Sequence, residues 1–260
     1  MIERIMDIVR EASRLMASPD KIKIMQKGGN ENIVTSSDIA VQDFLRARLA
    51  ELIPDSGFIC EEGDIADVRH SRVWIIDPID GTANYARGVD QCAICVGLCH
   101  EGRMEMSVVY LPRTGEMFSA VRGKGAWRNG ERIHVSARSF DDAIMCTALP
   151  VYHKEQAAWC ADAIRDVFMQ CNDIRRLGAA APELCYIAMG RFDMYFEYLL
   201  GAWDFAAASL IVEEAGGVLC NVTGQPLDPM KGSGVIAANS NENLQRLASI
   251  INSHNPASRP

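Results

Sequence analysis

The sequence predicts an α/β protein, a layered sandwich of two sheets with flanking helices. Between residues 92 and 135, short apolar runs alternate with glycine-containing turns, which is typical of an antiparallel meander. From residue 143 onward, candidate strands and helices alternate, which indicates a smaller mixed sheet covered by helices. A composition shift at residues 139–142 separates an N-terminal half, 1–140, from a C-terminal half, 141–260. The 260 residues suit one compact unit.

Helical spacing of apolar residues predicts two helices at the start of the chain. The first is expected from residue 2 to about Ala17, and the second from about Ser37 to Leu52. Residues 21–27 are compatible with a strand or a continued helix. Asp38 lies in the first turn of the second helix, where the helix dipole favours a negative charge. Taken locally, Asp38 is therefore a capping residue.

The string WIIDPIDGTANY, residues 74–85, is the centre of the first half. Its leading apolar residues predict the end of a buried strand, which we expect to stop at Pro78 because proline cannot donate to a sheet ladder. Gly81 permits a tight turn, and Thr82 is predicted to be the N-cap of a following helix. The string thus predicts a junction of strand, turn and helix.

Two carboxylates, Asp77 and Asp80, lie at this junction beside the Thr82 hydroxyl. A bare D-P-x-D would more often be a pair of turn residues. Hard cations such as Mg²⁺ prefer oxygen ligands, however, and helix N-termini attract phosphate. The junction offers both.

The remaining elements follow from apolar runs and breaker residues. Strands of the meander are expected at 92–99, 105–110, 116–121, 126–128 and 133–135. In the second half, strands are expected at 143–148, 173–177, 192–198, 218–222 and 235–238, and helices at 154–169, 181–189, 205–215 and from 241.

Composition narrows the class of protein. The net charge of −8 argues against a nucleic-acid binder, which would carry a basic face, but allows an anionic substrate if metal ions supply positive charge. No apolar run approaches the roughly 20 residues of a membrane span. The first residues have neither the basic start nor the long apolar core of a signal peptide, so we expect none. We therefore expect no nucleic-acid or membrane partner.

Nine cysteines, several in apolar runs, suggest reduced thiols in a cytoplasmic protein. Cys92 and Cys95 have the C-x-x-C spacing of zinc or redox sites. An odd separation along a strand sends the two side chains to opposite faces, so zinc is disfavoured.

The string DPIDGTANY, residues 77–85, resembles the first signature of the inositol monophosphatase family, D-P-[IL]-D-G-T-x-N-[FY]. A second string, WDFAAASLIVEEAGG at 203–217, resembles the family's second signature. Thr35–Asp38 and Glu61–Glu62 are similar to two further family segments, and the resemblance covers almost the whole chain. Three positions depart from the family pattern: Cys60 and Ala208 stand where glycine is usual, and Ala179 stands where serine or threonine is usual.

The resemblance implies a layered αβαβα sandwich of the sugar-phosphatase type, with a metal site in the cleft between the halves. The implied metal ligands are Glu61, Asp77, Asp80, Asp204 and the carbonyl of Ile79. Carboxylates brought together repel one another unless cations neutralise them, so two or three Mg²⁺ ions are expected. Local alternatives remain: Glu61 and Glu62 as solvated residues, Asp204 as an ordinary N-cap. Lys27 is expected near the metal edge.

The resemblance also implies direct attack of a metal-activated water on a phosphate monoester. Glu61 would bind metal, and Thr82 would position or deprotonate the water with Asp38 as its partner. The amides of Gly81 and Thr82 would hold the phosphate. Substrate contacts are expected from Asp80, Gly81, Thr82, Ala180, Glu197 and Asp204.

Among substrates, the resemblance points first to inositol monophosphate. Fructose-1,6-bisphosphate and 3′-phosphoadenosine 5′-phosphate are alternatives with the same mechanism. Glu197, seven residues before Asp204, is expected to bind a substrate hydroxyl, or else to be a solvated residue at a strand end. Arg191 and Asp193 are further candidates for the pocket.

A different class is also compatible with the sequence: a non-catalytic scaffold whose acidic cluster is a structural Ca²⁺ site. Asp38 and Thr82 speak against it, because a structural site needs neither. A homodimer and lithium sensitivity are implied by the family alone.

Overall fold

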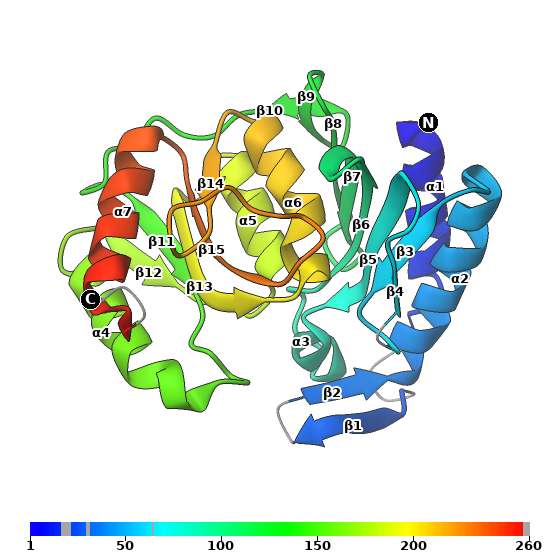
Figure 1. Ribbon diagram of the computed structural model, residues 1–260, viewed down its shortest axis with the longest axis horizontal. Helices are drawn as coiled ribbons and strands as arrows, with labels where there is room; N and C mark the ends of the chain where they lie inside the picture. Colours follow the sequence, from blue (N-terminus) through cyan, green and yellow to red (C-terminus); the bar gives the residue numbers. More distant parts are fainter. Residues whose placement is uncertain (17–21, 30–31, 64, 257–260) are drawn as a thin grey trace.

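Two β-sheets and three pairs of helices form five layers in the computed structural model, which describes residues 1–16, 22–29, 32–63 and 65–256 (Figure 1). The first pair, α1 and α2, covers the outer face of the larger sheet. The second pair, α5 and α6, lies between the sheets, and the third pair, α4 and α7, covers the outer face of the smaller sheet. The αβαβα sandwich is confirmed. The helices are α1 (Ile2–Ser13), α2 (Ser36–Leu52), α3 (Thr82–Ala86), α4 (Ala157–Phe168), α5 (Ala180–Ala188), α6 (Ala202–Glu214) and α7 (Asn241–His254).

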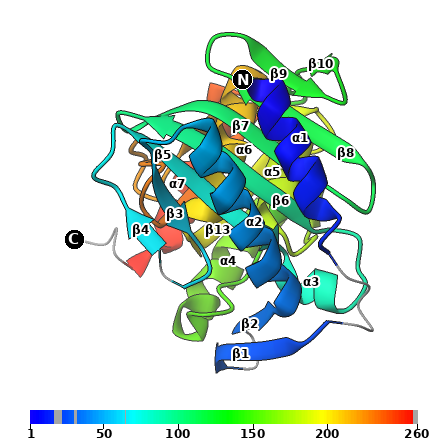
Figure 2. The ribbon, with the colours of Figure 1, turned by 90° about the vertical axis from the view of Figure 1, so that its right-hand side faces the viewer.

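The larger sheet has eight strands in the order β10-β9-β8-β7-β6-β5-β3-β4. All neighbours pair antiparallel except β3 and β5, which are parallel. Figure 2 shows α1 and α2 side by side across this sheet. Its strands are β3 (Gly57–Cys60), β4 (Ile65–Asp67), β5 (Arg72–Asp80), β6 (Ala93–His100), β7 (Arg103–Leu111), β8 (Glu116–Val121), β9 (Gly125–Arg128) and β10 (Glu131–Ile133).

Strand β5 departs from the prediction at its functional end. It does not stop at Pro78 but continues to Asp80. Asp77 pairs with Cys95 of β6, and the register then shifts before the next pair, so Pro78 lies in an irregular segment where its missing N–H costs no ladder bond. The predicted cap is also wrong: Gly81, with φ +83°, is the N-cap of α3, and Thr82 is the first helical residue.

The smaller sheet has five strands in the order β12-β11-β13-β15-β14. Strand β11 is parallel to β12 and β13, while β15 is antiparallel to both of its neighbours, so the sheet is mixed as predicted. Its strands are β11 (Ile144–Thr147), β12 (Asp173–Arg175), β13 (Met194–Leu200), β14 (Val218–Cys220) and β15 (Ser233–Ala238).

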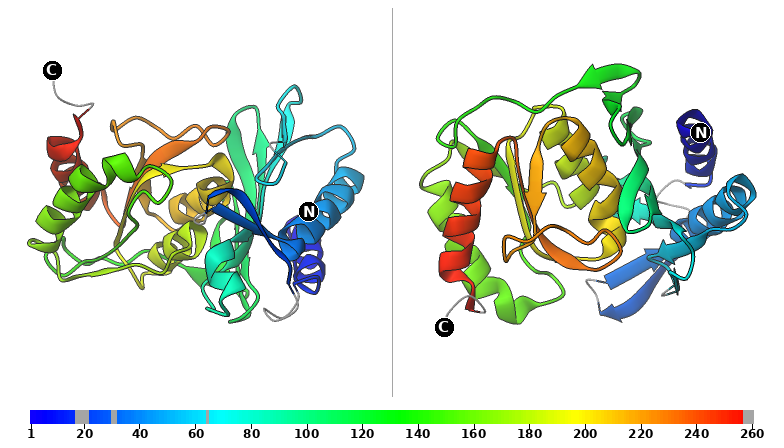
Figure 3. Two further views of the ribbon diagram at one scale, coloured as in Figure 1. Left: turned by 90° about the horizontal axis from the view of Figure 1, so that it is seen from below. Right: turned by 45° about the horizontal axis from the view of Figure 1, so that its top comes forward.

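The segment between the first two helices forms a separate hairpin, β1 (Ile24–Gly29) and β2 (Asn32–Thr35), which projects beside α3 (Figure 3). The strand alternative is therefore the correct one for residues 24–27, and residue 21 lies outside the described residues. Helix α1 ends at Ser13, and the predicted end at Ala17 lies outside the described residues. The single helix expected at 154–169 is divided into a 3₁₀ turn, η2 (Lys154–Gln156), and α4.

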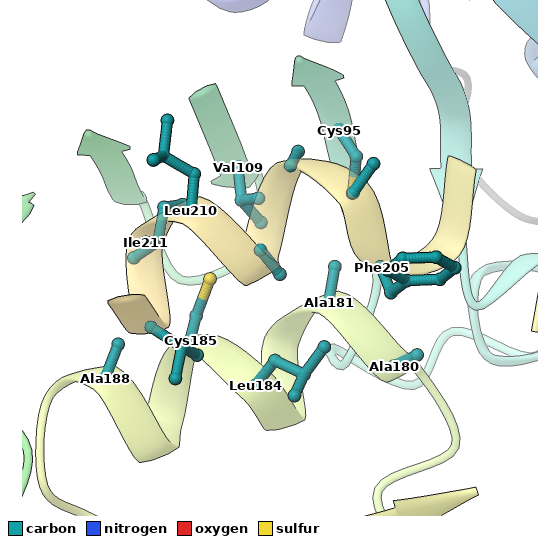
Figure 4. Close-up of a cluster of buried hydrophobic side chains, with 14 of the residues drawn as sticks. Cys95, Val109, Ala180, Ala181, Leu184, Cys185, Ala188, Phe205, Leu210 and Ile211 are labelled. Carbon is teal, nitrogen blue, oxygen red and sulfur yellow. The ribbon is translucent and has the colours of Figure 1, made fainter. Parts of the chain in front are cut away.

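Helix α6 packs closely against both the larger sheet and α5. Ala206, Ala207 and Ala208 are buried, and a Cβ atom placed on Gly97 of β6 would lie 3.6 Å from the Cα atom of Ala207. Figure 4 shows Cys185 of α5 pointing toward α6. Small residues thus bring the start of α6 close to the end of β5, which positions the site described below. No helix in the described ranges combines the length and apolarity needed to cross a bilayer.

Candidate active site

Three carboxylates from both halves of the chain meet in one cluster, which we call the acidic cluster: Asp77 and Asp80 at the end of β5, and Asp204 in the first turn of α6. One oxygen from each lies within 4.8 Å of the others. The structure therefore brings together three of the four carboxylates predicted to bind metal.

Each carboxylate of the acidic cluster is fixed by the backbone. Asp77 Oδ1 accepts a hydrogen bond from the Ile79 amide (2.9 Å), while its Oδ2 is buried without a hydrogen-bond partner. Asp204 Oδ2 accepts from the amide of Gly201 (2.6 Å), which is the N-cap of α6, so Asp204 is not itself the N-cap.

Asp80 connects the halves. Its two carboxylate oxygens accept hydrogen bonds from the amides of Ala180 (3.3 Å) and Ala181 (2.6 Å) at the start of α5. The last residue of β5 thus holds a helix that belongs to the other half of the chain.

Burial raises the pKa of all three carboxyls in the acidic cluster. The pKa of Asp80 rises to about 7, because burial and the charges of Glu197 and Glu61 outweigh its two amide hydrogen bonds. The pKa values of Asp77 and Asp204 rise well above the usual range, through burial and then through neighbouring carboxylates. Such a cluster needs protons or a cation for neutrality, and oxygen-only donors with one unpartnered oxygen fit a hard cation such as Mg²⁺.

Glu61 and Glu62 face different surroundings. Glu61 lines the same pocket as the acidic cluster but lies outside it, with Oε1 3.0 Å from the Lys27 ammonium. Glu62 is buried, and its Oε1 lies 2.6 Å from the same ammonium. The backbone amide and carbonyl of Glu62 both form hydrogen bonds with the side-chain amide of Gln42. Glu62 is thus a structural residue, and Lys27 lies beside the site as expected.

Thr82 and Asp38 form a hydrogen-bonded pair at the edge of the acidic cluster. Thr82 Oγ1 lies 3.0 Å from Asp38 Oδ1 and 2.9 Å from the Ile79 carbonyl oxygen. Asp38 is buried and also forms a capping box with Thr35 at the start of α2, accepting from its amide (2.9 Å) and its hydroxyl. Asp38 is therefore both a capping residue and the partner of Thr82.

The acidic cluster lies in a pocket of about 550 Å³ between the two halves. Glu197, in the middle of β13, lines this pocket and accepts a hydrogen bond from the Tyr195 hydroxyl (2.6 Å). Burial raises the pKa of Glu197 to about 7, so it is not a freely solvated strand-end residue. The pocket is lined by Ile24, Ile33, Glu61, Asp77, Ile79, Asp80, Gly81, Thr82, Ala83, Ala86, Arg87, Ala148, Val151, Tyr152, Arg176, Gly178, Ala179, Ala180, Glu183, Glu197, Leu200 and Asp204.

Arg191 and Asp193 do not belong to the pocket, contrary to the prediction. Asp193 is fully buried and is paired with Arg138 (3.0 Å). Arg191 lies against the Tyr186 ring and Glu116. Both residues stabilise the ends of secondary structure instead.

Sequence reasoning missed several residues of the pocket wall. Glu183 is 1% exposed and its carboxylate accepts hydrogen bonds from the backbone before α5. Its position two residues after the Gly178–Ala181 segment was the available signal. Arg87, Tyr152 and Arg176 line the pocket from segments without a motif, so no local pattern indicates them.

The comparison with known proteins places this chain in a class. Residues 2–255 match the model of the inositol monophosphatase family. The chain belongs to the inositol monophosphatase family.

Three relatives illustrate the similarity. The chain is 38% identical over 221 residues to the Nus factor SuhB of Escherichia coli K12, covering 83% of this chain and 82% of that protein. The extragenic suppressor protein suhB of Bartonella henselae superposes with a TM-score of 0.86 at 30% identity, over 96% of each chain. An IMPase from Thermotoga maritima superposes with a TM-score of 0.85 at 29% identity, over 96% of this chain and 95% of that one.

Proposed function

We propose that this protein is a Mg²⁺-dependent phosphatase that hydrolyses small phosphate monoesters, inositol monophosphate first. One observation carries the proposal: the unpartnered, buried Oδ2 of Asp77 lies in a cluster of carboxylates from both halves of the chain, within the pocket that also contains Thr82. Membership of the inositol monophosphatase family supports it.

The donor set suits Mg²⁺. Asp77, Asp80 and Asp204 would hold it, with Glu61 and the Ile79 carbonyl completing a site for two or three ions. When bound, Mg²⁺ supplies positive charge for phosphate oxygens and makes a coordinated water more acidic.

Thr82 and Asp38 would orient the attacking water. The Asp38 carboxylate accepts the hydrogen of the Thr82 hydroxyl, so the Thr82 oxygen can in turn accept a hydrogen bond from a water in the pocket. Asp38 itself is fixed by Thr35, which keeps the hydroxyl in one orientation. The amides of Gly81 and Thr82 remain the predicted phosphate contacts.

The part of the pocket lined by Glu197 of β13 would receive the alcohol part of the substrate. The carboxylate of Glu197 is an acceptor for hydroxyl donors, and Ala180 also lines the pocket. Several adjacent hydroxyls on a polyol or sugar suit this part of the pocket, which favours inositol monophosphate over a nucleotide.

The scaffold alternative is weaker. A structural Ca²⁺ site requires carboxylates but no hydroxyl held by a second buried carboxylate, as Thr82 is held by Asp38. A cytoplasmic homodimer belongs to the same proposal, and light scattering of the purified protein tests the dimer.

Phosphate release by the purified protein tests the function. The substrates are inositol 1-phosphate, fructose-1,6-bisphosphate and 3′-phosphoadenosine 5′-phosphate, each with Mg²⁺ and with EDTA. We expect release only with Mg²⁺ and fastest from inositol 1-phosphate. Release at equal rates in EDTA, or no release from any of the three, would contradict the proposal.

A further inference from the structure

In the turn that precedes α5, both the amide and the carbonyl of Leu177 form hydrogen bonds with side chains. The amide of Leu177 donates to Glu183 Oε1 (2.5 Å), and so does the amide of Gly178 (3.2 Å). From the opposite side, Asn84 Nδ2 donates to the carbonyl oxygen of Leu177 (2.8 Å). Glu183 belongs to α5, whereas Asn84 belongs to α3 in the other half of the chain.

The same turn packs directly on the end of β5. A Cβ atom placed on Gly81 would lie 2.9 Å from the Cβ of Ala179, so a side chain at position 81 would displace the turn. Asp80 accepts hydrogen bonds from the amides of Ala180 and Ala181, the next two residues. Three successive residues, 179–181, thus contact the end of β5 that bears the acidic cluster.

These contacts matter because the two halves share no sheet. Strand β5 belongs to the eight-stranded sheet and β13 to the five-stranded sheet. The distance between the acidic cluster and Glu197 of β13 therefore depends on packing and on side-chain hydrogen bonds. Gly178, Ala179, Ala180 and Glu183 all line the pocket between them.

We propose that Asn84 and Glu183 are positioning residues that set the distance between the acidic cluster and the part of the pocket, lined by Glu197, that receives the alcohol part of the substrate. They act through the turn of Leu177 and Gly178, and they control substrate affinity more than the chemical step. This inference rests on the proposed phosphatase function.

Two substitutions test the pair. In Asn84→Asp, an isosteric carboxylate replaces the donor and faces the Leu177 and Gln91 carbonyl oxygens that Asn84 now binds. In Glu183→Ala, the acceptor for both amides is lost. Because a small misplacement of a positioning group weakens productive binding, we expect each to raise KM for the best substrate about tenfold and to lower kcat less.

Inorganic phosphate separates positioning from general damage. It has no alcohol part and would contact only the metal end of the pocket, so its inhibition constant should change by no more than about twofold in both variants. Glu183→Gln retains the acceptor oxygen and should restore KM. Asn129→Asp is the matched control, because Asn129 uses its Oδ1 to accept from the Met117 amide and an aspartate preserves that bond.

A second readout does not depend on activity. Hydrogen exchange of the Leu177 and Gly178 amides should be slow in the wild type and in Glu183→Gln, and faster in Glu183→Ala. If the wild type hydrolyses nothing, the proposed function fails while this exchange still tests the pair. Unchanged exchange in Glu183→Ala, or equal increases in KM and in the phosphate inhibition constant, would overturn the inference.

Discussion

The role of Thr82 depends on which acceptor receives its one hydroxyl hydrogen. Two acceptors, Asp38 Oδ1 and the Ile79 carbonyl oxygen, lie within 3.0 Å of Thr82 Oγ1. A hydroxyl donates only once, and a charged carboxylate is the stronger acceptor. Asp38 therefore orients the hydroxyl and leaves an oxygen lone pair of Thr82 for a water.

Replacing Thr82 by valine tests this role with little change in shape. Thr82→Val removes the hydroxyl but keeps the branched side chain, so we expect kcat for phosphate release to fall about 10²-fold or more. Thr82→Ser keeps the hydroxyl and should retain most activity. Steady-state kinetics with saturating Mg²⁺ measures both, and a fully active Thr82→Val would rule out the role.

Glu183 gives a prediction for stability against pH. Burial raises its pKa to about 8, the charges of Glu197 and Asp80 add to this, and the amides of Leu177 and Gly178 oppose it. Because the folded pKa exceeds the unfolded value of about 4.3, the group stabilises the fold at low pH, and this contribution is lost as pH rises toward 8.

Glu183→Gln should therefore be more stable than the wild type at pH 8.5, on the order of a few kcal/mol, and this advantage should shrink toward pH 5. The Cys146 thiol, which also feels the Glu183 charge, is unchanged in the variant. Urea unfolding in EDTA at both pH values measures the difference. Glu242→Gln, an exposed position, is the control. An advantage independent of pH would contradict the raised pKa.

At the scale of elements, periodicity predicts most helices and strands, because their burial repeats along the chain. It fails where an element depends on a distant partner. The continuation of β5 through Pro78 is possible only because the register with β6 shifts there, and the local sequence holds no sign of that shift. The hairpin β1–β2 could not be predicted for a different reason, because the pattern of residues 21–27 is compatible with both a strand and a continued helix.

The C-terminal end of α6 is tied to the turn between β8 and β9. The carboxylate of Glu214 accepts hydrogen bonds from the amides of Gly123 and Gly125 (both 2.8 Å), whereas the carboxylate of Glu213 forms an exposed ion pair with Arg122. Glu214 is therefore a structural residue, and Glu213 is a surface residue.

Glu214→Ala should lower the free energy of unfolding by about 1–3 kcal/mol, because two amides lose their acceptor. The adjacent Glu213→Ala should cost less than about 1 kcal/mol, as exposed ion pairs do. Both should keep normal kcat, since the pocket lies at the other end of α6. Chemical denaturation measures the two losses; equal losses, or a fall in kcat, would contradict this account.

At the scale of the whole molecule, the site is built across two halves that share no sheet. Asp77, Asp80 and Asp204 could be predicted because each stands in a recognisable signature. Their convergence within 4.8 Å depends on the close packing of α6 against the larger sheet. Arg87, Tyr152 and Arg176 could not be predicted as pocket residues, because only the fold brings their segments to one cavity.

A cation shared by both halves should stabilise the whole molecule. At about 100 times its dissociation constant, Mg²⁺ should add roughly 2.7 kcal/mol and raise Tm by about 5–10 °C, and EDTA should reverse the shift. Asp204→Asn should lose the shift without a lower Tm in EDTA, because it relieves repulsion among buried carboxylates. Asp55→Asn, whose side chain is fully exposed, should respond like the wild type. Scanning calorimetry measures these values, and an unchanged Mg²⁺ shift in Asp204→Asn would argue against the shared site.

The most direct measurement is the rate of phosphate release during a Mg²⁺ titration, with inositol 1-phosphate and the wild-type protein beside Asp77→Asn. The wild-type rate should rise from background to saturation. The variant loses the carboxylate that bears the unpartnered oxygen. Because this removes several kcal/mol of transition-state stabilisation, we expect its rate to be lower by about 10³-fold or more. Comparable rates in the two proteins, or a wild-type rate independent of Mg²⁺, would contradict the claim that the acidic cluster is a catalytic metal site.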